Sequence, residues 1–267
     1  MENKIQLVVF DWAGTTTDFG GQAPVQVFNK TFVEKGLQFT KEEINAPMGM
    51  EKKEHIRSML STDKGRAMWK AVYSRDWNEA DIEEIYQCFE NNLRSVVAEY
   101  SKLIPGVKNA VDELRAMGLK IGSTTGYTSE MMQYVSPVAK EQGYTPDCLV
   151  TPDVTAYSRP TPFMVFECMR RFGIYPASHV VKVGDTVMDI LEGKNAGAWG
   201  IGLLKGSNLV GLSEEEHHAC SEEELQDLYE NARQAYLNAG ADIVLNDITE
   251  LPKAIERINA CLAKEAK

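Results

Sequence analysis

The sequence lacks any arrangement of cysteines or histidines that would build a disulfide framework or a zinc site. Its five cysteines are scattered and include no C-x-x-C pair, and its four histidines show no metal-ligand spacing. His217 and His218 follow an acidic run and are expected at the surface. We expect free thiols, buried or half-buried, at Cys88, Cys148, Cys168, Cys220 and Cys261.

Long apolar runs and an excess of basic residues are also absent. No window reaches the roughly 18 apolar residues of a membrane-spanning helix, and the first residues lead into a strand without a signal-peptide pattern. The net charge of -11 argues against binding to nucleic acid or to an anionic membrane, because both need basic surface. We therefore expect a cytoplasmic protein, in which an anionic substrate would need positive charge from the site itself.

The chain does have enough apolar residues for a large core, since 43% of its 267 residues are hydrophobic. Leu7-Val8-Val9-Phe10 is a continuous apolar run that predicts a fully buried strand. Asp11 follows directly, at the carboxyl end of the strand, where ligands bind in open parallel sheets. On local sequence alone, Asp11 could equally cap a turn.

The rest of the chain has two regions with different patterns of predicted secondary structure. Residues 20–102 show helical patterns only, whereas strands and helices alternate from residue 103 onward. Alternation of this kind predicts a doubly wound parallel sheet with right-handed crossovers. We predict an α/β core domain of residues 1–19 and 103–267, with a small all-helical domain of residues 20–102 inserted after the first strand.

Polar residues follow three of the predicted strands. Asp11, Thr125 and Asp185 should meet, because the carboxyl ends of parallel strands emerge at one edge of the sheet. Carboxylates from different strands suit Mg²⁺, which takes few protein ligands and leaves room for a phosphate oxygen. Asp189 would lie on the same helical face one turn after Asp185. Alternatively, Asp185 and Thr125 are helix caps and Asp189 is a solvated acid of a first helical turn.

Arg159 lies in a proline-rich loop after the third core strand. A basic residue there could neutralise the charges of carboxylates and of a phosphoryl group. The alternative is an ordinary surface arginine.

Together, D-W-A-G-T at Asp11, S-T-T-G at Thr125, Arg159 and G-D-T-x-x-D at Asp185 resemble the four motifs of the haloacid dehalogenase (HAD) superfamily, in order. The helical block resembles that superfamily's small cap. Most phosphatases of the superfamily carry a second aspartate two residues after the nucleophile, as general acid and base, whereas this chain has Ala13. Loss of such an acid typically costs 10²- to 10⁴-fold in rate, so an ordinary ester hydrolase is disfavoured.

Three longer segments resemble the phosphonoacetaldehyde hydrolase (phosphonatase) family: D-W-A-G-T-T-x-D, residues 46–57 of the helical block, and residues 122–128. The resemblance implies hydrolysis of the carbon-phosphorus bond of phosphonoacetaldehyde to acetaldehyde and phosphate, in the degradation of 2-aminoethylphosphonate. It implies Asp11 as the nucleophile and Lys52, the first lysine after P-M-G-x-x, as the residue that forms a Schiff base with the aldehyde. A protonated imine would accept the electrons of the broken bond.

The remaining site residues follow from the same resemblance. Mg²⁺, the one expected cofactor, would bind Asp11, Asp185 and the backbone carbonyl of Ala13. Asp189 and Thr186 would support this metal site. The residues expected to bind the substrate or stabilise the transition state are Thr125, Gly126, Arg159, His55, Met48 and Tyr127.

Lys52 must be partly uncharged to attack a carbonyl, so its pKa should be lowered by burial or nearby positive charge. Taken alone, Lys52-Lys53 would be read as an exposed basic face of a helix. The family resemblance also implies a homodimer formed through the cap. Two other functions stay open: a HAD phosphatase or phosphomutase for a small phosphate ester, and a receiver-like module that is phosphorylated on Asp11 without turnover.

Overall fold

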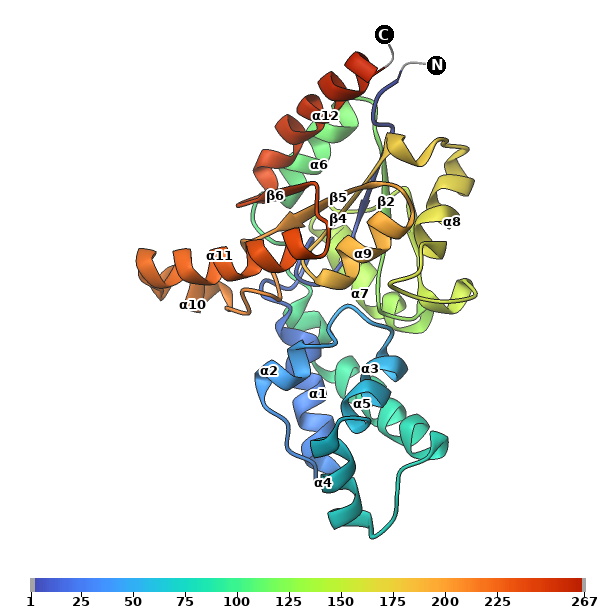
Figure 1. Cartoon of the computed structure of the whole chain (residues 1–267), viewed down its shortest axis with the longest axis vertical. Coiled ribbons are helices and arrows are strands. Elements are labelled where there is room, and N and C mark those ends of the chain that lie inside the picture. The colour runs from blue at the N-terminus through green and yellow to red at the C-terminus, as the bar shows by residue number, and fades with distance from the viewer. Residues whose placement is uncertain (1–2, 266–267) are drawn as a thin grey trace.

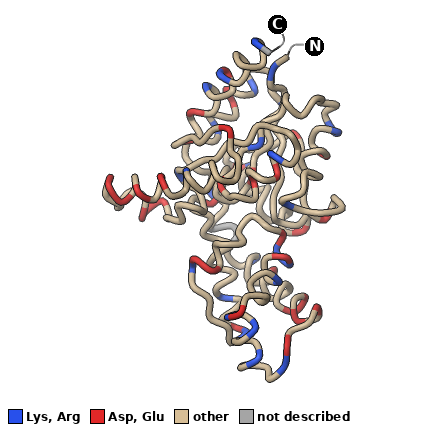
Figure 2. Tube along the Cα trace, viewed as in Figure 1, with Lys and Arg blue, Asp and Glu red and all other residues tan. Residues whose placement is uncertain are grey.

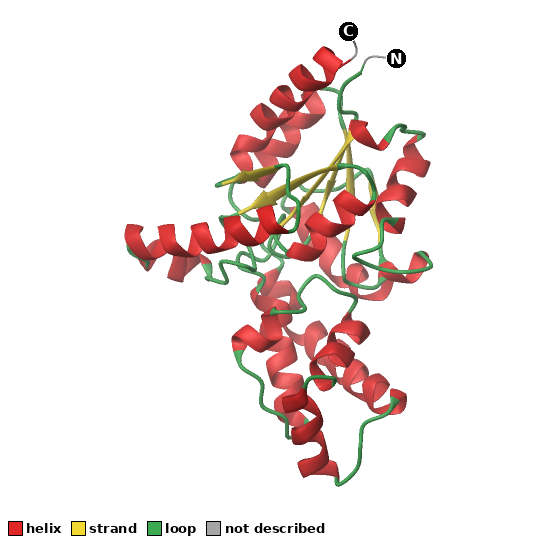
Figure 3. Cartoon of the chain, in the orientation of Figure 1, coloured by secondary structure: helices red, strands yellow, loops and turns green. Residues whose placement is uncertain are grey.

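The computed structural model describes residues 3–265, and of their side chains all but those of 97–99 and 265. In this part of the chain six strands form one parallel sheet of order β3-β2-β1-β4-β5-β6 (Figure 3). The strands are β1 Leu7–Phe10, β2 Lys120–Thr124, β3 Cys148–Val150, β4 Val180–Gly184, β5 Trp199–Leu203 and β6 Ile243–Leu245. The predicted doubly wound sheet is confirmed. Its strand order reverses between β1 and β4, which is where ligands bind in such sheets.

Helices cover both faces of the sheet (Figure 1). In β1, Val8 and Phe10 join the large apolar cluster of one face, while Leu7 and Val9 pack with residues of α8 on the other. Burial on both faces explains why β1 reads as a continuous apolar run. The helices of the core are α6 Val107–Ala116, α7 Ser129–Glu141, α8 Phe163–Phe172, α9 Val187–Asn195, α10 Glu214–Ala219, α11 Glu222–Asn238 and α12 Leu251–Glu265.

The inserted segment folds into a separate helical lobe beside the carboxyl edge of the sheet (Figure 1). Its helices are α1 Gln22–Glu34, α2 Lys41–Asn45, α3 Lys52–Leu60, α4 Asp63–Tyr73 and α5 Glu79–Tyr100. Aromatic residues of α1 and α5 form its centre, where the rings of Phe28 and Phe89 lie 4.4 Å apart. The predicted all-helical cap is therefore present, and its boundaries at residues 20 and 102 stay a prediction.

The two linkers of the cap run side by side. Thr17 and Leu103 form an antiparallel bridge, and the backbone N–H of Asp18 donates to the carbonyl of Lys102 at 3.0 Å. Asp18 then begins the cap, because its carboxylate accepts the backbone N–H groups of Gln22 and Ala23, each at 3.0 Å. Burial outweighs these hydrogen bonds and raises the pKa of Asp18 to about 7.

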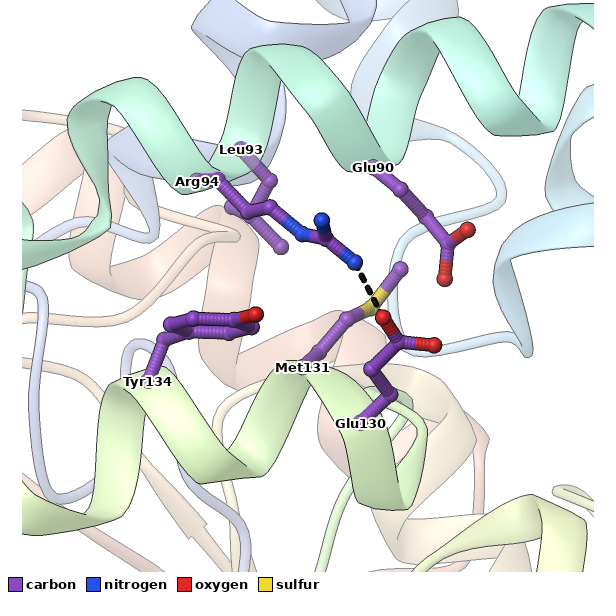
Figure 4. Close-up of a pocket in the computed structure, with 6 residues that line it drawn as sticks. All are labelled: Glu90, Leu93, Arg94, Glu130, Met131 and Tyr134. Atoms are coloured by element: carbon purple, nitrogen blue, oxygen red, sulfur yellow. Dashed lines mark hydrogen bonds and ion pairs between the residues drawn. The ribbon is translucent and has the colours of Figure 1, made fainter.

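The cap also touches the core away from its linkers. Arg94 of α5 pairs with Glu130 of α7, and its guanidinium lies 5.2 Å from the ring centre of Tyr134 (Figure 4). Gly126 approaches the cap so closely that a Cβ there would lie 2.8 Å from the carbonyl oxygen of Met50. The cap is thus closed on the sheet edge.

Acidic residues gather on α10 and the start of α11, which project to one side of the core (Figure 2). Within residues 3–265, no helix combines the length and apolar character needed to cross a membrane. The thiols are free, with Cys148 and Cys168 buried, Cys88 and Cys220 half-buried and Cys261 exposed. His218 is exposed, whereas His217 is half-buried and hydrogen-bonded to the hydroxyl of Tyr229 at 2.8 Å.

Candidate active site

The edge of the sheet between β1 and β4 brings three buried carboxylates together. Oxygen atoms of Asp11, Asp185 and Asp189 all lie within 4.8 Å of one another. The backbone holds Asp11 in place, because its N–H donates to the carbonyl of Val183 at 2.9 Å. This is the convergence that the sequence predicts for residues more than 170 positions apart.

The pKa values of two of these carboxylates, Asp185 and Asp11, are raised. Burial, followed by repulsion from Asp11 and Asp189, raises the pKa of Asp185 well above its usual value. Its hydrogen-bond donors are neutral: the Thr15 hydroxyl and the backbone N–H of Asn208, each at 2.9 Å. Burial also raises the pKa of Asp11. A hard divalent cation fits this set of oxygen ligands.

Gly14 makes room for the carboxylate of Asp185. Its φ of +87° favours glycine, and a Cβ would lie 2.1 Å from Oδ2 of Asp185. Ala13 lines the same cavity as Asp11. The D-W-A-G-T turn is thus shaped around Asp185.

Asp189 plays a different part, because its oxygens are already occupied. Oδ1 pairs with Lys182 at 2.7 Å and with Arg159 at 3.0 Å, while Oδ2 accepts the hydroxyl and N–H of Thr186. Burial alone would raise the pKa of Asp189, but Arg159 and Lys182 outweigh it and lower the pKa. Asp189 therefore caps α9 and holds the two cations beside the site.

Arg159 is buried at the centre of the charge network, which excludes the surface arginine as an interpretation. Its guanidinium pairs with Asp11 at 2.7 Å and with Glu192 at 2.9 Å. The carbonyl and hydroxyl oxygens of Thr124 accept two further hydrogen bonds, each at 2.8 Å. A cation is thus held against Asp11, at the sheet edge where anionic ligands could bind.

Residues after β2 form the next wall of the cavity. Thr125, Gly126 and Tyr127 all line it, and the hydroxyl of Thr125 accepts the backbone N–H of Tyr127 at 3.1 Å. Thr125 is not the cap of the next helix, because Thr128 occupies the N-cap position of α7.

Lys52, the first residue of α3, enters this cavity from the cap. Only 4% of the residue is exposed, so the basic-face interpretation is wrong. Its ammonium lies 5.2 Å from the ring centre of Tyr127 and 5.7 Å from that of Phe28. Burial lowers the pKa of Lys52 to about 8, although Asp11 and Glu51 act in the opposite direction.

The neighbouring predicted residues of the cap divide into two groups. Met48 lines the cavity with Lys52. His55 does not line it: the ring is fully buried and stacks on Phe28 with ring centres 3.9 Å apart. Neither ring nitrogen has a hydrogen-bond partner among the described residues. Burial, then the charge of Lys52, lowers the pKa of His55 well below its usual value.

The cavity itself has a volume of only about 30 Å³. This volume holds one or two water molecules. Gly49 and Gly126 of the facing surfaces leave no space for a Cβ, so cap and core are in close contact beside the cavity.

Three residues that lie at the site were not predicted from the sequence. Lys182 interrupts the apolar β4, and a charged residue in a buried strand is a signal that could have been followed. Glu192 lies on α9 one turn from Asp189, and Asn208 lies in an unremarkable loop after β5. Only the fold shows that they reach the site.

Asp11, Thr125, Arg159 and the neighbouring buried carboxylates at one sheet edge define a HAD hydrolase. The family model for haloacid dehalogenase-like hydrolases matches residues 5–197, and the chain belongs to this family. Within it, the chain is 44% identical to the phosphonoacetaldehyde hydrolase of Bacillus cytotoxicus over 96% of its length and 97% of the relative. It is also 44% identical to the phosphonoacetaldehyde hydrolase of Parabacteroides distasonis, over the same shares of the two chains. The family resemblance seen in the sequence is thereby confirmed.

A solved structure leads to the same group. The fold matches that of a phosphonoacetaldehyde hydrolase-like protein from Oleispira antarctica with a TM-score of 0.95 and 38% sequence identity. The match covers 97% of this chain and 94% of the other. The inserted helical cap is therefore shared with this relative, since the match includes nearly the whole chain.

Proposed function

We propose that the protein hydrolyses the carbon-phosphorus bond of phosphonoacetaldehyde, giving acetaldehyde and inorganic phosphate. One observation carries the proposal: a buried lysine of lowered pKa, Lys52, shares a small cavity with the nucleophile Asp11. The same cavity has an alanine, Ala13, where an ester hydrolase would need an acid. The site is thus equipped to receive electrons from carbon rather than to protonate an oxygen.

Lys52 begins the reaction. Its uncharged amine adds to the aldehyde carbon, and loss of water leaves a protonated imine on Nζ. A carboxylate oxygen of Asp11 then attacks phosphorus, and the carbon-phosphorus bond breaks as its electron pair forms the double bond of an enamine. The positive charge on the imine nitrogen is neutralised in this step, so no free carbanion forms.

Two hydrolyses complete the turnover. The enamine takes a proton on the carbon that carried phosphorus, and water then releases acetaldehyde from Lys52. A second water cleaves the aspartyl phosphate on Asp11 to inorganic phosphate. One water is released and two are consumed, so the net reaction uses one water.

The other residues of the site have supporting parts in this proposal. Arg159 and Thr125 would hold the phosphonyl oxygens, with Gly126 allowing the cap to close over them. Tyr127 and Met48 would enclose the imine, and His55, one turn along α3, would influence its protonation. Mg²⁺, bound by Asp11, Asp185 and the carbonyl of Ala13, would screen the nucleophile from the anionic phosphonyl group.

The decisive experiment uses Lys52. Borohydride reduction in the presence of phosphonoacetaldehyde or acetaldehyde should add an ethyl-type label to the Lys52 peptide, detected by mass spectrometry. Lys52→Arg should lose acetaldehyde production by at least about 10⁴-fold, because it removes the covalent route. Lys53→Arg is the matched control, since Lys53 pairs with Glu83 at 2.6 Å outside the cavity. An unlabelled Lys52 peptide, or full activity of Lys52→Arg, would overturn the proposal.

The same cavity makes phosphate esters poor substrates. We expect small sugar phosphates to be hydrolysed at least about 100-fold more slowly than phosphonoacetaldehyde, because Ala13 cannot protonate an alkoxide. The measurement is phosphate release from both substrate classes under the same conditions. Comparable rates would favour the phosphatase alternative instead.

We further propose a homodimer formed through the cap. Large apolar side chains are exposed on the described part of the cap: Val33 by 53%, Val72 by 47% and Tyr73 by 37%. They belong to one region, because Val72 lies beside Gly36 and the hydroxyl of Tyr73 donates to the carbonyl of Lys35. Scattered apolar residues are ordinary, but a contiguous group suits an interface.

Sedimentation equilibrium tests the dimer. Val72→Glu should convert it to monomers, whereas Leu237→Glu on α11, a site 45% exposed, should leave it intact. A wild-type monomer at micromolar concentration would contradict the proposal.

A further inference from the structure

Asn208 connects the metal site to the cap. Its backbone N–H donates to Oδ2 of Asp185 at 2.9 Å. Its side-chain Nδ2 donates at 3.1 Å to Oδ1 of Asn45, the last residue of α2 in the cap. Asn208 is 2% exposed and lines the same cavity as Asp11 and Lys52. It therefore touches both halves of the closed molecule.

One polar atom of the Asn208 side chain lacks a hydrogen-bond partner among the described residues. This atom, Oδ1, is buried. A buried acceptor without a donor is unfavourable, and an oxygen beside an anion site would repel the ligand. Its surroundings on the side of the hinge are tight, since a Cβ on Gly21 would lie 3.2 Å from the Asn208 side chain.

Rotating the side-chain amides of Asn208 and Asn45 by 180° removes the unpartnered acceptor. The two ends of a side-chain amide have nearly the same shape, so the exchange needs no other movement. Asn45 then donates to Asn208, which preserves their hydrogen bond, and the amide nitrogen of Asn208 takes the place of its unpartnered oxygen. Asn208, which lines the cavity, then has a free amide donor instead of an unpartnered acceptor.

We propose that Asn208 is a binding residue for the anion, with its side-chain amide donating to an oxygen of the phosphonyl group or of product phosphate. Its hydrogen bond to Asn45 orients the amide only while the cap is closed, so the contact is made in the closed enzyme. The inference rests on the proposed function, because it takes a phosphonate or phosphate as the bound anion. It adds a donor from the loop after β5 to those of Arg159 and Thr125.

Binding of inorganic phosphate in the presence of Mg²⁺, measured by isothermal titration calorimetry on the full chain, tests the proposal without turnover. Asn208→Ala should raise the Kd for phosphate roughly 10- to 100-fold, the range for loss of a hydrogen bond to a charged group. Asn208→Asp should raise it further, because a carboxylate repels the anion. Borohydride trapping of acetaldehyde on Lys52 needs no phosphate contact and should change less than about twofold.

Asn45→Ala is the matched control, because it removes the partner but keeps Asn208. It should weaken phosphate binding less than Asn208→Ala does. Equal effects of the two variants, wild-type phosphate affinity in both Asn208 variants, or parallel loss of phosphate binding and trapping would each overturn the assignment. If the wild type binds phosphate but releases no acetaldehyde, the proposed function fails while the phosphate titrations still decide the role of Asn208.

Discussion

The proposed Schiff base requires that a single residue, Lys52, have an uncharged amine near neutral pH. A lysine in water is almost entirely protonated at neutral pH and cannot attack a carbonyl. Burial beneath the cap lowers the pKa of Lys52 to about 8, which leaves a useful fraction of free amine. The two aromatic rings near its ammonium supply bulk that excludes water. Neither Asp11 nor Glu51 restores the usual value.

This pKa predicts a pH profile for imine formation. The rate of borohydride trapping of acetaldehyde on Lys52 should rise about tenfold per pH unit below pH 8 and level off above it, because the free amine forms as pH rises through the lowered pKa. The measurement is single-turnover trapping between pH 6 and 10. Nα-acetyl-lysine, with a pKa near 10.4, is the reference and should keep rising past pH 9. A protein profile that matches the reference would show that Lys52 titrates as an exposed lysine.

Glu192 illustrates a residue whose removal should affect stability. Its Oε2 accepts from Thr124 at 3.0 Å and from Arg159 at 2.9 Å, with Lys182 at 3.5 Å. Glu192→Gln should lower the free energy of unfolding by about 3 kcal/mol, because it removes one of the carboxylates that balance the buried cations Arg159 and Lys182. Urea denaturation measures the loss.

Asp112→Asn gives the matched comparison for Glu192→Gln. Asp112 pairs with Lys108 one turn away on α6, and both side chains are more than half exposed. Asp112→Asn should lower the free energy of unfolding by less than about 1 kcal/mol, the range of surface ion pairs. Similar losses in the two variants would mean that the charge network around Arg159 contributes little.

The sequence was sufficient to predict the site residues that directly follow a strand. Asp11 and Asp185 could be placed because strand and edge are encoded locally, by an apolar run and the polar residues after it. Glu192 and Asn208 could not, since their roles depend on how α9 and the loop after β5 pack against segments far away in the chain. The outcome for His55 is similar: spacing placed it near Lys52, but only packing decides whether it faces the cavity or Phe28.

At the scale of elements, closure depends on glycines where cap and core meet. Gly126 follows β2 and faces the carbonyl of Met50 in the cap loop before α3. Gly49 faces Thr186 in the same way, with a Cβ-to-hydroxyl distance of 2.5 Å if a side chain were added. Both contacts lie beside the cavity, so the fit of these surfaces sets the distance between the two halves of the site.

Gly126→Ala should therefore hold the cap slightly open. We expect kcat/KM to fall about 10- to 100-fold, because a displacement of about 1 Å misaligns the imine and the nucleophile. The free energy of unfolding should be nearly unchanged, since the added methyl group clashes with the cap only when the cap closes. Steady-state kinetics and urea denaturation measure the two effects.

Gly200→Ala is the control for added volume. A Cβ at Gly200 in β5 would meet only the flexible side chain of Lys194 at 3.3 Å and Ile190 at 3.6 Å. Activity should stay within about twofold. If Gly126→Ala is equally active, the close approach of cap and core is not needed for catalysis.

At the scale of the whole molecule, the proposed reaction is divided between two bodies. The cap supplies Lys52 for the aldehyde, and the core supplies Asp11, Arg159 and the metal site for phosphorus. The acidic residues of α10 and α11 lie to one side of the core (Figure 2). Lys52 and Arg159 are the basic residues that line the cavity, so the positive charge that an anion would meet there comes from the site itself.

This division predicts that metal removal separates the two halves of the reaction. Treatment with a chelator should abolish phosphate release while leaving borohydride trapping of acetaldehyde on Lys52 within about twofold of its original rate. The reason is that Asp11 and Asp185 need the cation, whereas amine addition does not. Added Mg²⁺ should restore phosphate release. Loss of both activities on chelation would show that the metal also supports the cap side of the site.

The paired linkers have a consequence for how such a protein can be modified. The chain leaves the core at Asp18 and returns at Lys102 across one hydrogen bond of 3.0 Å, so the whole helical segment is topologically a surface loop. For protein engineering, the cap is therefore an exchangeable insert, because another segment with equally close ends could replace it without altering the order of the strands. Such an exchange would remove Lys52, which we propose for the aldehyde, and would leave the residues proposed for the phosphoryl chemistry in the core.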